Sequence, residues 1–127
     1  MDIKSDYGYE KTNSKERNYI IGKYYEDLAT YYLTEKGYEI IERNFDTDRG
    51  EIDIICKNDE FMVFVEVKYR KSGRYGLPRE AVTYAKQKKI RKAASYYIAV
   101  NKIRNMDFRF DVIEIIKDEI THLENAF

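Results

Sequence analysis

The segment from Glu60 to Arg70 limits the possible folds of this chain more than any other feature of its sequence. In an extended strand its apolar side chains alternate onto both sides of the backbone. One side carries Phe61, Val63, Val65 and Val67, and the other carries Met62 and Phe64. Because a strand that is apolar on both faces has to be covered on both, we expect it at the centre of its sheet.

Two helices are expected to cover such a sheet. The first spans residues 14–36, because Asn13 and Glu16 form a capping box, and it ends at Gly37. Pro78 favours the first turn of a second helix that reaches about Val100. Helical spacing predicts that the first helix faces the core with Ile21, Tyr25, Leu28 and Tyr32.

The remaining strands follow from short apolar runs bounded by turn residues. They are expected at residues 38–45, 50–57, 107–117 and 120–123. In the strand at 50–57, alternation puts Ile52, Ile54 and Cys56 on one face and Glu51, Asp53 and Ile55 on the other. The element order is then α-β-β-β-α-β-β, an α/β fold with a central mixed sheet flanked by helices. We expect residues 1–12 to be a flexible polar tail and residues 13–127 to be one domain.

Composition excludes several classes of protein. With 127 residues the chain fits one domain, and 43% hydrophobic and 36% charged residues with a mean hydropathy of -0.71 argue against a membrane protein. A single cysteine, Cys56, allows no internal disulfide and no zinc site built on cysteine pairs. The first residues show no apolar signal segment, so the cytoplasm is the expected location.

The charges are segregated although the net charge is +0. Between Lys68 and Arg104 there are twelve basic residues and one acid, Glu80, a formal charge of +11. Such a segment attracts polyanions, although it can also be an ordinary solvated helix face. We expect it to bind nucleic acid, DNA above all, through Arg70, Lys71, Arg74, Arg79, Lys86, Gln87, Lys88 and Arg91.

Glu66 and Lys68 share the face of the central strand that carries Met62 and Phe64. Burying a carboxylate there is costly unless it is paired or binds a metal. If Asn58 and Asp59 form a two-residue turn, Lys57 pairs with Glu60, Asp53 faces Phe64 and Glu51 faces Glu66. That register brings four polar side chains to one side of the sheet: Glu51, Asp53, Glu66 and Lys68.

Two neighbouring carboxylates can share one hard cation and leave positions for water and phosphate oxygens. A lysine beside them can orient or deprotonate a water, or stabilise charge that develops on a phosphate. The arrangement is typical of phosphodiester hydrolysis. A plain salt bridge between Glu66 and Lys68 remains the alternative.

Five segments in this order resemble the bacterial YraN-like family. They are Gly50–Asp53, Val63–Arg70, Gly76–Val82, Lys86 with Gln87, and Arg109–Val112. That family is similar to Holliday-junction resolvases, within the PD-(D/E)xK (restriction-endonuclease-like) nucleases. The resemblance extends over about residues 15–117 and implies a restriction-endonuclease-like core.

The resemblance also implies a site. Asp53 and Glu66 match metal-binding acids for Mg²⁺ or Mn²⁺, Lys68 matches the catalytic lysine, and the backbone carbonyl of Val67 would complete the metal shell. Glu26 matches a supporting acid on the first helix. Ile52 stands where the superfamily's name has Pro, and Tyr25 stands where Gly usually precedes the helix acid. Glu51 is a further candidate metal ligand.

Three functions remain open from the sequence. The first is a divalent-metal-dependent DNA endonuclease, acting on branched or recombination-intermediate DNA. The second is a catalytically weak or inactive nucleic-acid-binding accessory module of the same fold. The third is an interaction domain whose acidic and basic parts bind each other. A homodimer is a further expectation, because cutting a junction requires access to two strands.

Overall fold

A computed structural model describes residues 13–71 and 82–127. The elements are α2 (Ser14–Glu35), β1 (Glu39–Thr47), β2 (Gly50–Lys57), β3 (Phe61–Arg70), α3 (Tyr84–Val100), β4 (Asp107–Ile116) and β5 (Glu119–Leu123). This is the predicted α-β-β-β-α-β-β order. The predicted tail at 1–12, and Arg74, Pro78 and Arg79, lie outside the described residues.

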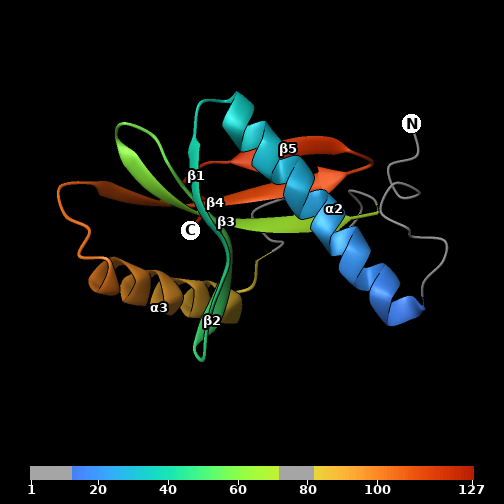
Figure 1. Cartoon of the computed structure of the whole chain (residues 1–127), viewed down its shortest axis with the longest axis horizontal. Helices are drawn as coiled ribbons and strands as arrows, with labels where there is room; N and C mark the ends of the chain where they lie inside the picture. Colours follow the sequence, from blue (N-terminus) through green and yellow to red (C-terminus); the bar gives the residue numbers. More distant parts are fainter. Residues whose placement is uncertain (1–12, 72–81) are drawn as a thin grey trace.

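The five strands form one mixed sheet in the order β1-β2-β3-β4-β5. β3 runs parallel to β4, while the other neighbouring strands are antiparallel. α3 lies in the connection between the two parallel strands, as such a crossover requires. The prediction that the strand apolar on both faces is central is therefore confirmed (Figure 1).

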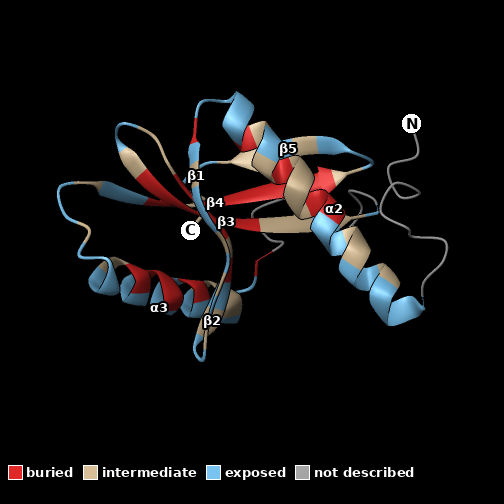
Figure 2. Ribbon diagram, in the orientation of Figure 1, coloured by how far each residue is buried: buried red, intermediate tan, exposed pale blue. Residues whose placement is uncertain are grey.

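Two separate cores explain why β3 is apolar on both sides. α2 packs against Val63 and Val65, and α3 packs against Met62 and Phe64. The red stripes in Figure 2 show the buried sides of both helices turned toward the sheet. Burial raises the pKa of the Cys56 thiol, which belongs to the α2 core, to about 12. Within residues 13–71 and 82–127, neither helix combines the length and apolar character that crossing a bilayer requires.

The helix boundaries differ from the predictions at two places. α2 ends at Glu35 and Gly37 follows with φ of 100°, as its predicted role as helix terminator requires. α3 begins at Tyr84 rather than Pro78, because the Thr83 hydroxyl accepts a hydrogen bond from the Lys86 N–H and caps the helix. The most buried residues of α2 are Tyr24, Tyr25, Ala29 and Leu33, and the predicted Ile21, Leu28 and Tyr32 are only partly buried beside them.

The predicted hairpin register is wrong by two residues. Lys57 pairs with Met62, not with Glu60. The cause is Asn58, whose Oδ1 accepts hydrogen bonds from the N–H groups of Glu60 and Phe61 and so closes a longer loop. A shift by two residues does not in itself exchange the two faces of a strand.

Alternation along β2 also breaks at one point. Ile54 and Cys56 belong to the α2 core, whereas Ile52 joins Ile55 in the α3 core. The prediction that Ile52 shares a face with Ile54 is therefore wrong. On the neighbouring β1, Asn44 has a positive φ of 54°, and this irregular backbone lies opposite the point where β2 changes faces. Asp53 occupies that point.

Candidate functional site

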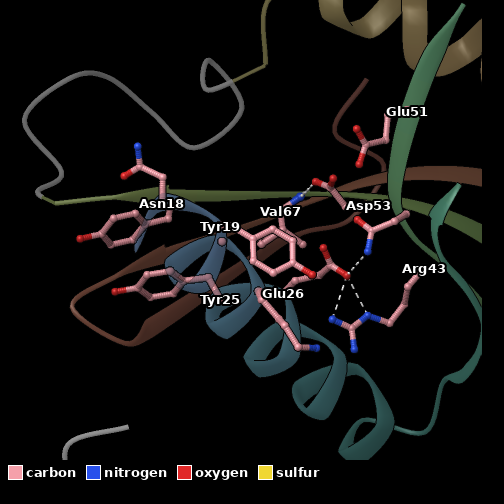
Figure 3. A pocket seen from close by; sticks show the side chains of 12 residues that line it. Asn18, Tyr19, Tyr25, Glu26, Arg43, Glu51, Asp53 and Val67 are labelled. Atoms are coloured by element: carbon pink, nitrogen blue, oxygen red, sulfur yellow. Dashed lines mark hydrogen bonds and ion pairs between the residues drawn. The ribbon is translucent and has the colours of Figure 1, made fainter. Parts of the chain in front are cut away.

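Asp53 lies where β2 and β3 separate. The ladder between them runs only as far as the pair Ile54 and Val65. Beyond it, the Asp53 carboxylate takes the place of a strand partner: Oδ2 accepts a hydrogen bond of 2.8 Å from the backbone N–H of Val67 (Figure 3). The part-buried carboxyl is thus fixed against β3 by the backbone of the residue that follows Glu66.

Glu66 is almost fully buried beside it. Its side chain is 6% exposed, and Oε1 lies 3.7 Å from the Lys86 Nζ of α3. With both acids ionised, the other oxygen, Oε2, is buried without a hydrogen-bond partner among the described residues, whereas a protonated Glu66 bonds Asp53. A buried oxygen in this state is energetically costly, so it marks a place where a ligand would be stabilising.

The two carboxyls perturb each other. Burial raises the pKa of Glu66 to about 8, and the negative charge of Asp53 acts in the same direction against the positive charges of Lys86 and Lys68. Burial also raises the pKa of Asp53, although the hydrogen bond from Val67 opposes it. Two acids that resist ionisation in one place are typical of a functional site.

Lys68 lies two residues beyond Glu66 on β3 and is partly exposed. Its charge acts on Glu66, as the predicted proximity requires. The ion pair that the structure shows for Glu66, however, is with Lys86. This ion pair places Lys86, a predicted phosphate contact, at the site itself. The Lys86 side chain is 43% exposed.

Glu26 extends toward the site from α2, but its carboxylate is bound by the guanidinium of Arg43 and the side-chain amide of Asn44. Its Oε1 accepts hydrogen bonds of 2.8 Å from both Arg43 Nε and Asn44 Nδ2. Arg43 also bonds Asp27 at 2.6 Å. Within the described part of the chain, no three His, Cys, Asp or Glu side chains come together as a group that could hold a metal ion. Glu26 is near Asp53, since its charge raises the pKa of Asp53, but it does not complete such a group.

A cleft of about 480 Å³ opens in front of these acids. Its lining includes the polar residues Glu26, Arg43, Glu51 and Asp53, together with Val67 (Figure 3). Burial, together with the charges of Asp53 and Asp46, raises the pKa of Glu51. The structure therefore brings Asp53, Glu66, Glu51 and Glu26 to one region. The metal-binding role of each, and of the Val67 carbonyl, stays a prediction.

Several predicted phosphate contacts have partners within the protein. Arg70 bonds Glu114 at 2.8 Å with a side chain that is only 16% exposed. Gln87 Nε2 donates to the Val82 carbonyl. Arg91 lies over the Phe110 ring and Lys88 over the Tyr84 ring, each at 4.8 Å from the centroid. The polar Gln87 on the inner side of α3 is thus explained by a local hydrogen bond, while Lys71 and Lys88 are exposed.

Sequence reasoning missed several residues that line the cleft, namely Asn18, Tyr19, Gly22, Lys23, Arg43, Asn44 and Tyr69. One signal was available, because Tyr19 precedes Glu26 by seven residues, close to two helical turns. No sequence pattern predicts the contact of Arg43 with Glu26, which joins β1 to α2 across a turn.

The fold and the cleft define a class of protein. It is an α/β domain with a mixed sheet in which β2 and β3 separate at two neighbouring carboxyls, Asp53 and Glu66, with lysines beside them. A sequence model described as Uncharacterised protein family UPF0102 matches residues 25–115. The chain belongs to this family, which is the YraN family, and the resemblance stated from its sequence segments is confirmed. The match includes Glu26, Asp53, Glu66 and Lys68.

Curated relatives share most of the chain. A UPF0102 protein of Clostridium acetobutylicum is 49% identical over 112 residues, covering 84% of this chain and 92% of that protein. One of Thermodesulfovibrio yellowstonii is 50% identical over 107 residues, covering 84% and 95%. One of Clostridioides difficile is 44% identical over 117 residues, covering 91% and 99%.

Proposed function

We propose that this protein is a divalent-metal-dependent DNA endonuclease that hydrolyses phosphodiester bonds in branched or recombination-intermediate DNA. The observation that supports the proposal most is the pair formed by Asp53 and Glu66 at the fork of β2 and β3. One oxygen of this pair, Glu66 Oε2, is buried without a hydrogen-bond partner in the described structure. A cation bound between the carboxyls would satisfy it.

The donor set suits Mg²⁺ or Mn²⁺. These hard cations are commonly bound by one or two protein carboxylates, with water and substrate phosphate oxygens at the other positions. Asp53 and Glu66 would hold the ion, with the Val67 carbonyl as the predicted backbone ligand and Glu51 at the cleft wall. A bound divalent ion supplies Lewis-acid polarisation of the phosphate and a lower pKa for an attacking water.

The chain's own groups have separate tasks. The backbone N–H of Val67 orients the Asp53 carboxylate through a 2.8 Å hydrogen bond, so the carboxylate is already held in place for a metal ion. Lys68 orients or deprotonates the attacking water and stabilises the charge that develops on the phosphate. Lys86 holds Glu66 from α3 and offers a second positive charge near the substrate phosphate.

One observation favours a second candidate, a catalytically weak or inactive nucleic-acid-binding accessory module. Arg43 and Asn44 both donate hydrogen bonds to the Glu26 carboxylate. The candidate metal site therefore has fewer carboxylates free to bind a metal than a site with three. In that case the cleft and the basic helix α3 bind DNA but no bond is cut. Only a cleavage measurement separates the two candidates.

The test is a cleavage panel of linear, nicked, flapped and four-way DNA with Mg²⁺ or Mn²⁺. We expect the wild type to cut at least one branched substrate, and Asp53→Asn to abolish cutting because the metal loses a charged ligand. Asp59→Asn, the same change at an exposed position of the hairpin loop, is the matched control and should cut normally. A wild type that cuts none of the substrates would favour the accessory module.

A further inference from the structure

We infer that the aromatic end of the cleft binds an unpaired nucleobase of DNA, stacked against Tyr19 and Tyr69 beside the carboxyl pair. Where the proposed endonuclease function holds, the substrate then has an unpaired nucleotide next to the bond that is cut. The cutting position rests on the proposed function, whereas the stacking itself does not. The residues that carry this inference are not used by the metal site.

Tyr19 and Tyr69 line the same cleft as Asp53 and Glu26. Tyr19 is 72% exposed and Tyr69 is 36% exposed, so both rings lie at the surface. Figure 3 shows the Tyr19 side chain turned toward the opening that also receives Glu26 and Asp53. Two accessible aromatic side chains therefore line the same cleft as Asp53, one of the two acids proposed to hold the metal.

The Tyr69 ring is held in place by the buried ring of Tyr25. Its ring stacks on Tyr25 with centroids 4.0 Å apart and an interplanar angle of 13°. Tyr25 is 5% exposed and also contacts Tyr24, at 4.8 Å between centroids. Because Tyr25 covers one face of Tyr69 and fixes its orientation, the exposed part of Tyr69 is a preorganised platform on which a base can continue the stack.

The chemistry of the cleft selects an unpaired base. A base inside a duplex is already stacked on both neighbours, whereas a base in a flap, gap or junction can stack on an aromatic side chain. Lys23 and Asn18 also line the cleft, and a cation and an amide suit the backbone of such a strand. Lys23 has an exposed pairing with Asp27 at 3.7 Å, which is weak enough to be exchanged for a phosphate.

The stacking is tested by DNA binding in EDTA, where no metal-dependent cutting occurs. The probes are a 12-nucleotide oligo(dT) strand and a blunt 12-base-pair duplex, followed by fluorescence anisotropy. Base stacking on an aromatic residue gives about a 5- to 100-fold effect on substitution by alanine. Tyr19→Ala should weaken single-strand binding by that factor and leave duplex binding unchanged, while Tyr19→Phe should bind like the wild type.

Tyr31 provides a control position, and tryptophan fluorescence provides a direct readout of stacking. Tyr31 is on the same helix and is 65% exposed but is not part of the cleft lining, so Tyr31→Ala should change neither affinity. The chain has no tryptophan. Tyr19→Trp therefore gives a single probe, whose emission should be quenched on binding oligo(dT), whereas that of Tyr31→Trp should not.

Several results would overturn the inference: equal losses for single strand and duplex, no effect of Tyr19→Ala, absence of quenching, or a wild type that does not bind the strand. A change in oligomeric state with Tyr19→Ala would assign the ring to contacts between copies instead. If Tyr19→Ala does not weaken single-strand binding but cutting depends on Asp53, only the proposed stacking is rejected. If stacking is confirmed but the wild type cuts no DNA, only the proposed endonuclease function is rejected.

Discussion

Glu66 occupies a position that is unfavourable for stability alone. A carboxyl that is 6% exposed, next to a second carboxyl, loses hydration and is repelled by its neighbour. Lys86 offsets part of this at 3.7 Å, and one oxygen still has no partner among the residues described. Natural proteins keep such costs mainly where function requires them.

Glu66→Gln should therefore stabilise the metal-free protein. In EDTA at about pH 9, removing the charge should raise the free energy of unfolding by about 1 kcal/mol or more, which corresponds to about 3–5 °C in Tm. The Asp59→Asn control should leave Tm unchanged. Thermal unfolding followed by circular dichroism measures both, and a lower Tm for Glu66→Gln would show that the carboxylate is already well satisfied.

A second buried acid is satisfied instead. Asp111 is fully buried, accepts a hydrogen bond of 2.9 Å from Arg109 Nε and lies 2.7 Å from His122 Nε2. Burial acts to raise the pKa of Asp111, but the hydrogen bonds from His122, Arg109 and the Asn125 N–H outweigh it and lower that pKa. The network joins β4 to the end of the chain and has a structural role.

The lowered pKa of Asp111 has a defined effect on stability. Because the pKa is lower in the folded than in the unfolded chain, the stabilisation is complete above about pH 4 and is lost as the pH falls further. Asp111→Asn should cost about 3–5 kcal/mol at pH 7, since the buried Arg109 loses its closest carboxylate and keeps only Glu124 at 3.8 Å and the Tyr38 hydroxyl. In urea denaturation the gap between variant and wild type should narrow at pH 3, and an equal gap at both values would refute this role.

At the scale of elements, much of the fold could be predicted because local patterns determine it. The two apolar faces of β3 placed it at the sheet centre, and Gly37 marked the end of α2. The register of the β2–β3 hairpin could not be predicted, because it depends on which N–H groups the Asn58 side chain bonds. The start of α3 was predicted at Pro78, but the helix begins after the Thr83 cap, a residue that the sequence analysis did not single out.

The candidate site was predictable in part for the same reason. Asp53 and Glu66 lie close enough for the charge of Asp53 to raise the pKa of Glu66. A register error of two residues does not separate the two positions, although the alternation of β2 breaks at Asp53. Their contacts with Lys86 and the binding of Glu26 by Arg43 join residues from different layers. Such pairs depend on how the helices pack on the sheet, and no local spacing encodes them.

Gly50 shows how closely two elements approach near the site. A Cβ at this position would lie 2.7 Å from the Lys89 carbonyl oxygen of α3. Gly50→Ala should therefore force β2 and α3 apart and destabilise the protein by about 1–3 kcal/mol.

Gly22 of α2 provides the matched control. A Cβ there meets nothing within 4 Å, so Gly22→Ala should stabilise the protein by about 0.5–1 kcal/mol through helix propensity. Urea denaturation measures both variants. Equal effects of the two substitutions would contradict the close packing at Gly50.

At the scale of the whole molecule, the two helices flank the sheet on opposite sides (Figure 1). Their sequences differ in charge, because α3 carries basic residues and no acid whereas α2 carries both. Exposed basic residues of α3 include Lys88, Lys89 and Lys92. Lys86 of the same helix reaches Glu66, so the basic side of the molecule continues directly into the carboxyl pair. We expect DNA to lie along α3 with its backbone entering the cleft.

This arrangement predicts a salt-dependent affinity. Each phosphate that the protein neutralises adds about 0.9 to the slope of log affinity against log salt concentration for duplex DNA. Lys88→Glu with Lys92→Glu should reduce that slope by about 0.9 for each phosphate that the variant no longer neutralises. These two positions are preferred to Arg91 because Arg91 packs over Phe110 and Phe127 at the α3 core, whereas Lys88 lies over the exposed Tyr84. Lys15→Glu, at an exposed position of α2, is the control, and an unchanged slope in the double variant would leave α3 as a solvated surface.

The most direct test of the account is Mn²⁺ binding followed by electron paramagnetic resonance, on the wild type and three variants. The account predicts that the wild type binds Mn²⁺, that Asp53→Asn and Glu66→Gln lose this binding, and that Lys68→Ala retains it. Lys68→Ala should still cut DNA about 10²- to 10⁴-fold more slowly, because the lysine acts in proton transfer rather than as a ligand. Mn²⁺ binding that is unchanged by both Asp53→Asn and Glu66→Gln would contradict the account.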